Sequence, residues 1–288
     1  MVTRRVAMVI EPQIEREADH LTIGRMIGGS RMVLLDPFLL LDHMVLSPEA
    51  TEPEGFKRHP HRGIETLTYV FEGQVHHKDS LGNDSRVGAG GSQWMSAAGG
   101  IFHEEYLEPL PEGNNSLQIW FNLPTAERMK AARYQAVPGE AAPVVALEGG
   151  ASARVIAGEL QGREGALKGI AVRPAYLDVA LPAGASALLP APEGESTFAF
   201  LYRGEVAFEE SGIPIGGTPR LVVFSEQGDG VWALASNTGE ARFVFVSARP
   251  LREPVLQYRT LVTDSTEAMR QALEELEQGT FERQRNDG

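Results

Sequence analysis

The sequence predicts an all-β protein of two tandem β-barrel domains, with a short helix between them and a second helix near the C-terminus. Glycine and proline account for 31 and 18 of the 288 residues and separate short apolar runs throughout, as is typical of turn-rich β-proteins. A ten-residue β-rich pattern occurs twice in the chain. Only two segments have helical character, and the hydrophobic content of 42% suffices for packed cores.

The repeated pattern predicts a duplicated domain. Residues 66–75, TLTYVFEGQV, align without gaps on residues 197–206, TFAFLYRGEV, at an offset of 131. Each copy is a β-rich run that ends at a glycine turn, and such internal similarity is typical of repeated structural units. We therefore expect an N-terminal domain over residues 1–124 and a C-terminal domain over residues 136–288 that includes a closing helix.

The two segments differ in how clearly their sequence patterns predict a helix. Residues 125–134, TAERMKAARY, are short and polar and follow Leu123-Pro124, which predicts a linker helix. Residues 264–278 give a clearer pattern, in which Asp264 and Glu267 have the spacing of a capping box and Gly279 can end the helix. An apolar stripe at helical spacing is formed by Met269, Leu273 and Leu276.

Composition excludes several classes of function. The net charge of −13 disfavours binding to nucleic acid or to anionic lipid, so a small molecule or a protein partner is expected instead. The chain has no cysteine, which excludes thiolate metal sites and cysteine nucleophiles; any metal must use histidine and carboxylate. The first apolar run breaks at Glu11-Pro12, and no stretch reaches the roughly 18 apolar residues of a membrane span, so we expect a cytoplasmic protein.

The histidines indicate where the chemistry lies. All seven fall in the first 103 residues: His20, His43, His59, His61, His76, His77 and His103. At the offset of 131, His59 and His61 fall on Pro190 and Pro192, so the second domain cannot build the same site.

Two segments together predict a metal site. Residues two apart on a strand share a face, so His59 and His61 point to the same side, as do His103 and Glu105. If both strands face the interior of one barrel, three nitrogens and one oxygen surround a divalent metal such as Fe(II), Mn, Co, Ni or Cu(II). Glu65 is the rival carboxylate, because it has the same parity as the two strand histidines.

The other histidines and the aromatic residues carry weaker indications. We expect His76 and His77 to straddle the two faces of one strand, with a solvated or supporting role and not ligation. Trp94, Trp120 and Phe121 are expected in the barrel core, where one of them could line a substrate pocket, and Met95 is expected to fill the core.

The motifs resemble those of the pirins, which are two-domain members of the cupin superfamily. The resemblance covers nearly the whole chain and rests on five segments: LDPFLL at 35–40, HPHRGIET at 59–66, QWMSA at 93–97 running on to HEE at 103–105, LQIWFNL at 117–123 and PLREPV at 250–255. It implies two jelly-roll cupin domains with one metal, most often Fe(II), in the first. The positions that match the family's ligands are His59, His61, His103 and Glu105, which disfavours Glu65.

The resemblance also implies a function. Pirins are associated with quercetin 2,3-dioxygenase activity, in which a flavonol-like substrate and O2 react at the metal, and Glu105 is the expected proton acceptor. The alternative is a metal-binding regulatory protein that binds a protein partner without turnover. The chain departs from the family at Glu104, where a small residue is usual, and at residues 260–265, TLVTDS.

Overall fold

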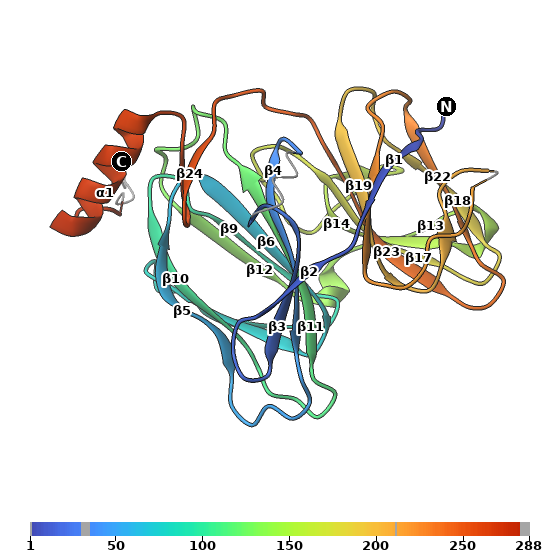
Figure 1. The fold of residues 1–288 in the computed structure, drawn as a ribbon, viewed down its shortest axis with the longest axis horizontal. Coiled ribbons are helices and arrows are strands. Elements are labelled where there is room, and N and C mark those ends of the chain that lie inside the picture. The colour runs from blue at the N-terminus through green and yellow to red at the C-terminus, as the bar shows by residue number, and fades with distance from the viewer. Residues whose placement is uncertain (1, 30–34, 211, 283–288) are drawn as a thin grey trace. The chain divides into compact units, whose positions relative to one another are not determined.

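The structure is a computed structural model that describes residues 2–29, 35–210 and 212–282 (Figure 1). Strands dominate these residues, and a single α-helix, α1 (Thr266–Gln278), lies near the end of the described chain. The predicted all-β class with a C-terminal helix is confirmed.

The chain folds into two compact units, each of which collects segments from distant parts of the sequence. One unit consists of Met1–Pro12, Ala141–Gly169 and Arg173–Pro250, and the other of Gln13–Glu140, Ile170–Val172 and Leu251–Gly288. The expected boundaries placed residues 1–12 in the first domain and residues 251–288 in the second, whereas each of these segments belongs to the other unit. At the N-terminus, β1 (Val6–Ile10) pairs with β21 (Arg220–Phe224), because backbone pairing across a sheet edge is independent of distance in sequence.

Two antiparallel sheets form the barrel of the unit that contains the histidines. The seven-stranded sheet has the order β12-β9-β6-β11-β4-β3-β2, and the four-stranded sheet has the order β5-β10-β7-β8. The strands of the larger sheet are β2 (Gln13–Arg16), β3 (Leu21–Ile27), β4 (Phe38–Leu46), β6 (Ile64–Glu72), β9 (Ser92–Ser96), β11 (Asn114–Asn122) and β12 (Arg133–Val137). Those of the smaller sheet are β5 (Glu54–His61), β7 (Gln74–Asp79), β8 (Asp84–Gly88) and β10 (Ile101–Leu107).

The interior of this unit is apolar at two places and polar between them. Strand β10 shows the arrangement, because alternate residues face inward and are buried. Its Ile101 packs in one apolar cluster with Ile64 and Trp120, whereas Leu107 packs in another with Val70. His103 and Glu105 lie between these two on the same face, so the barrel wall presents polar groups to its interior at this level.

The C-terminal segment of the chain packs on the strand that carries two of the histidines. Strands β24 (Leu256–Tyr258) and β25 (Leu261–Thr263) form a hairpin, and the Val262 amide donates to the Arg62 carbonyl at 3.0 Å. Gly63 makes this approach feasible: its φ is 76°, and a Cβ there would lie 2.0 Å from the Val262 carbonyl oxygen.

Helix α1 begins and ends with local capping interactions. Ser265 is the N-cap and accepts a hydrogen bond from the Ala268 amide, so the expected cap at Asp264 is wrong by one residue. Gly279 ends the helix in the left-handed conformation, as predicted. Met269 is buried and Leu276 partly buried, but Leu273 is 36% exposed, so the helix packs through a narrower face than the stripe indicated.

The predicted linker helix is wrong. Residues 125–130 form turns with hydrogen bonds between residues three apart, such as Lys130 to Glu127, and the chain then enters β12. That strand pairs with β9 from Arg133–Ser96 to Val137–Ser92. The tertiary sheet edge thus overrides the weak helical propensity of this segment.

The second unit repeats the same plan. Its seven-stranded sheet has the order β1-β21-β19-β23-β17-β14-β13, and a three-stranded sheet has the order β18-β22-β20. The further strands are β13 (Val144–Ala146), β14 (Ser152–Ala157), β17 (Ala175–Leu181), β18 (Ser186–Pro190), β19 (Ser196–Arg203), β20 (Val206–Ala207), β22 (Gly230–Ala235) and β23 (Ala241–Ala248), with the small hairpin β15 (Glu159–Leu160) and β16 (Arg163–Glu164).

The sequence repeat corresponds to equivalent strands. It falls on β6 and β19, which hold the same place in the two seven-stranded sheets, and Gly73 and Gly204 both have positive φ, of 85° and 73°. An apolar cluster that includes Phe208, Phe243 and Phe245 fills the second unit.

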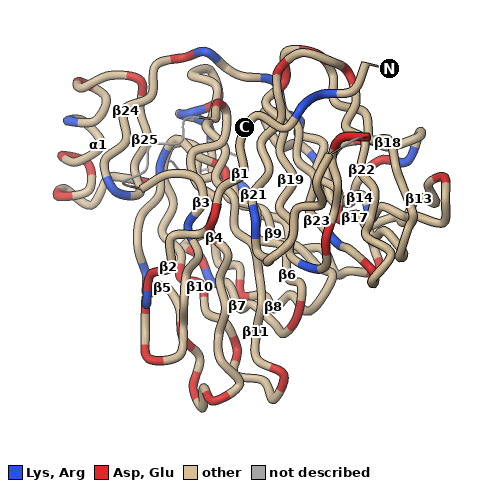
Figure 2. Tube along the Cα trace, turned by 45° about the vertical axis from the view of Figure 1, so that its right-hand side comes forward, with Lys and Arg blue, Asp and Glu red and all other residues tan. Residues whose placement is uncertain are grey.

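Charged residues are spread over both units. Aspartate and glutamate outnumber lysine and arginine by 39 to 26, and Figure 2 shows acidic positions in loops and strand ends of each unit. The net charge is therefore not confined to one acidic segment. Within the described part of the chain, no helix has the length and apolar character needed to span a membrane.

Candidate metal centre

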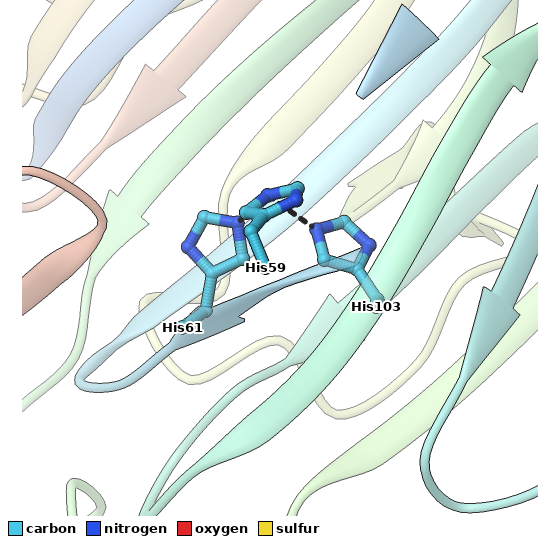
Figure 3. A group of neighbouring side chains, drawn as sticks. All are labelled: His59, His61 and His103. Carbon is cyan, nitrogen blue, oxygen red and sulfur yellow. Dashed lines mark hydrogen bonds between the residues drawn. The ribbon is translucent and has the colours of Figure 1, made fainter. Parts of the chain in front are cut away.

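Three histidines converge from two neighbouring strands of the four-stranded sheet. His59 and His61 occupy alternate positions on β5, and His103 on β10 lies directly opposite His59 in the antiparallel register. The Nε2 atom of His59 lies 2.9 Å from Nε2 of His61 and 3.2 Å from Nε2 of His103 (Figure 3). The strand alternation that suggested a shared face therefore brings three imidazole nitrogens to one point.

The nitrogen spacing suits one divalent ion. Imidazole nitrogens bind such ions at about 2.0–2.1 Å, so two ligands at roughly right angles lie about 2.9 Å apart and two at the tetrahedral angle about 3.3 Å apart. The observed separations of 2.9 and 3.2 Å fall in this range. Each of the three histidines offers one nitrogen to a group whose atoms lie within 4.8 Å of one another.

Burial keeps these imidazoles neutral. It lowers the pKa of His61 to about 3, with the neighbouring His59 as a further cause. Burial also lowers the pKa of His103 well below its ordinary value, and His61 and His59 add to this effect. The pKa of His59 is lowered for the same reason. Near neutral pH each ring therefore has an unprotonated nitrogen that can bind a metal.

Backbone carbonyls orient two of the rings. Nδ1 of His59 donates to the Lys57 carbonyl at 2.8 Å, and Nδ1 of His61 donates to the Thr260 carbonyl at 3.2 Å. A neutral imidazole has one N–H, so these contacts place the free lone pair on Nε2 of each ring. Such partners on the far nitrogen are the usual means by which proteins orient metal-binding histidines.

Glu105, the fourth predicted ligand, has different neighbours. Its side chain is 2% exposed and shares the inward face of β10 with His103. It accepts hydrogen bonds from Gln93 Nε2 at 2.8 Å, Gln118 Nε2 at 2.9 Å and Thr68 Oγ1 at 3.3 Å. Glu105 groups with His77 and His103, not with His59 and His61. Burial raises its pKa, and its ligation of a metal stays a prediction.

Glu65, the alternative carboxylate ligand, does not lie with the histidines. Glu65 is fully buried, but its Oε2 accepts from the Ala171 amide at 2.9 Å, and it belongs to neither histidine group. The parity argument failed because the chain turns at Gly63 between β5 and β6, so alternation does not carry from one strand to the next. On β6 it is Thr68, of opposite parity to Glu65, that faces Glu105.

The remaining histidines divide as the sequence indicated. His76 faces Asp84 at 2.7 Å, whereas His77 faces the interior beside His103. His20 pairs with Glu54, and His43 contacts Asn115. The two faces of β7 thus carry one histidine each, and both are buried, so neither is solvated as the sequence had indicated.

A cavity of about 970 Å³ opens beside the histidines. Its walls include His59 and His103, together with Gln118 and Trp120 from β11. Of the three aromatic residues predicted for the core, Trp120 lines the cavity and Trp94 and Phe121 do not. The ring of Trp120 lies edge-on to His61 with centroids 5.0 Å apart. Met95 and Trp94 are buried as core residues.

One wall of the cavity was missed by sequence analysis. Gln257, Arg259 and Thr260 line it, although they come from the C-terminal hairpin about 200 positions after His59. No local motif marks them as site residues, since only the long-range approach of β24 and β25 brings them there.

Two protein-family models match this chain, one in each half. The Pirin family matches residues 20–121, and the Pirin C-terminal cupin domain matches residues 176–282. The chain belongs to the pirin family. The resemblance of the motifs and the two-cupin fold are thereby confirmed.

Individual relatives extend over nearly the whole chain. A Pseudomonas aeruginosa protein named "Putative quercetin 2,3-dioxygenase" is 36% identical over 264 residues, 90% of this chain and 91% of its own. The crystal structure of quercetin 2,3-dioxygenase from Acinetobacter baumannii is 30% identical, with a TM-score of 0.86 and coverage of 97% and 98%. The Escherichia coli pirin YhhW, solved with nickel(II), shares the fold at 21% identity, with a TM-score of 0.65 and coverage of 84% and 100%.

Proposed function

We propose that this pirin is a metal-dependent dioxygenase of the quercetin 2,3-dioxygenase type. One metal would be held by His59, His61, His103 and Glu105, and a flavonol-like substrate and O2 would react beside it. The observation that carries the proposal is a set of three neutral imidazoles beside a large cavity, in which Nε2 of His59 lies about 3 Å from Nε2 of His61 and of His103. The dioxygenase names of relatives with 30–36% identity support the reaction class.

The donor set narrows the metal. Three nitrogens with one carboxylate suit a divalent transition metal. The pirin resemblance makes Fe(II) the first candidate, and Mn, Co, Ni and Cu are further candidates, as the nickel complex of the E. coli pirin illustrates. When bound, such an ion would supply a Lewis acid that favours deprotonation of a substrate hydroxyl and a redox centre for the reaction with O2.

The cavity suits a flat aromatic substrate. Its volume of about 970 Å³ is at the upper end of the range for drug-sized ligands, which spans roughly 300–1,000 Å³. Trp120, Leu40 and Phe56 offer apolar surface, and Arg259 can donate hydrogen bonds to phenolic oxygens. These residues would hold the ring system against the histidines and exclude water from the reacting atoms.

Glu105 is the proposed proton acceptor. Its carboxylate is buried, and burial raises its pKa, which increases its basicity when ionised. Gln93 and Gln118 hold the oxygens in place by donating to them, so the carboxylate is oriented before a substrate arrives. In this role Glu105 would leave the metal and take the proton of the flavonol 3-hydroxyl.

The test is turnover by purified protein loaded in turn with Fe(II), Mn, Co, Ni and Cu. O2 uptake and loss of flavonol absorbance are measured together, with His103→Ala as the site variant. The matched control is His43→Gln, which removes an imidazole whose ring contacts Asn115. Turnover in the wild type and control that disappears in His103→Ala supports the proposal. Stoichiometric metal without turnover of any flavonol would reject it in favour of a metal-binding regulator of a protein partner.

A further inference from the structure

His77 connects the metal-site histidine His103 to a buried carboxylate. Nδ1 of His77 lies 3.5 Å from Nδ1 of His103, and Nε2 of His77 lies 3.1 Å from Oδ2 of Asp79. The side chains of His77 and Asp79 are 2% and 0% exposed. The pair therefore lies inside the barrel, on the side of His103 away from His59.

Asp79 is fixed as a hydrogen-bond acceptor. Its Oδ1 accepts from the amides of Leu81 and Asn83 at 2.9 and 3.0 Å, and its Oδ2 accepts from Asn83 Nδ2 at 2.8 Å. Burial opposes ionisation of Asp79, but its hydrogen bonds with His77 and Asn83 outweigh burial and lower its pKa. Because an ionised carboxylate can only accept, the proton of the contact lies on Nε2 of His77.

Tyr134 also packs against the face of the His77 ring. The Tyr134 ring stacks on it with centroids 4.2 Å apart and an interplanar angle of 9°. The Tyr134 hydroxyl contacts Ser85 Oγ at 2.5 Å and donates to Gln93 Oε1 at 3.1 Å. Both the plane and the rotation of the His77 ring are therefore constrained by its neighbours.

This arrangement assigns a proton to one nitrogen of His103. The Nδ1–Nδ1 contact of 3.5 Å needs one donor and one acceptor. With its Nε2 proton directed to Asp79, His77 can accept at Nδ1, and the facing Nδ1 of His103 then donates. Nε2 of His103 is then the nitrogen with a free lone pair, and it is this atom that lies 3.2 Å from Nε2 of His59. His59 and His61 have the same pattern, but there the acceptor is a backbone carbonyl.

We infer that His77, held by Asp79 and Tyr134, is a positioning residue that fixes His103 in the Nδ1–H form and so directs its Nε2 to the metal. The inference rests on the proposed metal centre but not on the proposed reaction. It differs from a role for His77 as a ligand in a second site with His103 and Glu105, for which the three residues are also close enough. In that case His77 would bind a metal and not accept a proton from His103.

The first arm of the test uses metal-free wild-type protein. Histidine side chains labelled with ¹⁵N report by NMR which ring nitrogen is protonated. We expect His103 in the Nδ1–H form at neutral pH, and an Nε2–H form would overturn the inference. This measurement needs neither a variant nor turnover, so its outcome is independent of whether flavonols are substrates.

The second arm measures metal affinity in variants of His77. His77→Phe keeps a ring against Tyr134 but offers no acceptor, and His77→Gln offers an amide oxygen. The Kd for Co(II) should rise about 10- to 100-fold in His77→Phe, with partial recovery in His77→Gln. His76→Phe, on the opposite face of β7, is the matched control and should keep the wild-type Kd.

Two results of this arm would overturn the inference. One is a wild-type Kd in folded His77→Phe. The other is two bound metals per chain in the wild type with one lost in His77→Phe, which would make His77 a ligand.

Discussion

The Nδ1 atom of His61 lies 3.2 Å from the carbonyl oxygen of Thr260, a residue 199 positions later in the chain. Thr260 lies between β24 and β25, whose hairpin packs on the end of β5 through the contact between Val262 and Arg62. The C-terminal segment therefore both orients a metal-site histidine and forms a wall of the cavity beside it. Integrity of the site should depend on what anchors this segment.

Arg62 is the main anchor and gives the first prediction. It donates to the Gly99 carbonyl at 2.8 Å, to Glu275 Oε2 at 2.6 Å and to the Phe281 carbonyl at 2.7 Å. Arg62→Met should lower the free energy of unfolding by about 3–5 kcal/mol, because the largely buried Glu275 carboxylate loses the positive charge that it pairs with. Chemical denaturation measures the loss.

The control for Arg62 lies on α1. Arg270→Met removes ion pairs with Glu267 and Glu274 that are solvent-exposed, and it should leave stability unchanged. Equal stability of the Arg62 and Arg270 variants would contradict the role of Arg62 as an anchor.

Each of the three converging histidines should be necessary for metal binding. His59→Ala, His61→Ala and His103→Ala each remove one of three nitrogens that lie within 4.8 Å of one another, so most of the metal should be lost. Elemental analysis of protein after loading and gel filtration measures the ratio of metal to chain. A ratio equal to that of the wild type in any one variant would exclude that residue as a ligand.

Glu105→Gln separates metal binding from proton transfer. The amide keeps the volume of the side chain but cannot accept a proton at neutral pH, so turnover should fall about 10²- to 10⁴-fold while part of the metal remains bound. Glu104→Gln, on the opposite face of β10, should keep wild-type turnover. Full activity of Glu105→Gln, measured as flavonol loss, would remove the carboxylate from the reaction.

Metal removal should leave the protein folded. The apolar clusters around Leu107 and around Ile101 lie on either side of the polar level and do not need a metal for their packing. After chelation the far-ultraviolet circular dichroism at 25 °C should stay that of a β-protein, with cooperative thermal unfolding at a lower Tm. Loss of the β-spectrum on chelation would instead identify a structural metal.

Glu65 should make stability depend on pH. Burial raises the pKa of Glu65 to about 7, above its ordinary value of 4.5, so the folded protein binds this proton more tightly than the unfolded chain does. The resulting stabilisation is complete below pH 4.5 and is lost as the pH rises through 7. It amounts to on the order of 3 kcal/mol.

Glu65→Gln removes this titration. The Tm of the variant minus that of the wild type should therefore increase between pH 5 and pH 8. Glu72→Gln, at the exposed end of β6, should show a constant difference. A constant difference for Glu65→Gln as well would show that Glu65 does not titrate in this range.

Patterns within single strands were predictable from sequence, and so was the repeat. Alternation on β5 and on β10 correctly placed His59 beside His61 and put His103 and Glu105 on one face, because side-chain direction in a strand is a local property of the backbone. The β-run and glycine turn of the repeat likewise correspond to β6 and β19 with their following turns. The residues that share one face of a strand can therefore be read from the local sequence, without knowledge of how that strand packs.

Two predictions that crossed a turn or ignored a sheet edge failed. The turn at Gly63 separated Glu65 from the face of His59, and pairing with β9 drew residues 133–137 into a strand where a helix was expected. Tertiary structure alone decided that Thr260 meets His61, that His77 meets His103, and that Glu105 meets two glutamine amides. These contacts join residues on different elements, so their geometry depends on how the strands pack and not on the spacing of residues along the chain.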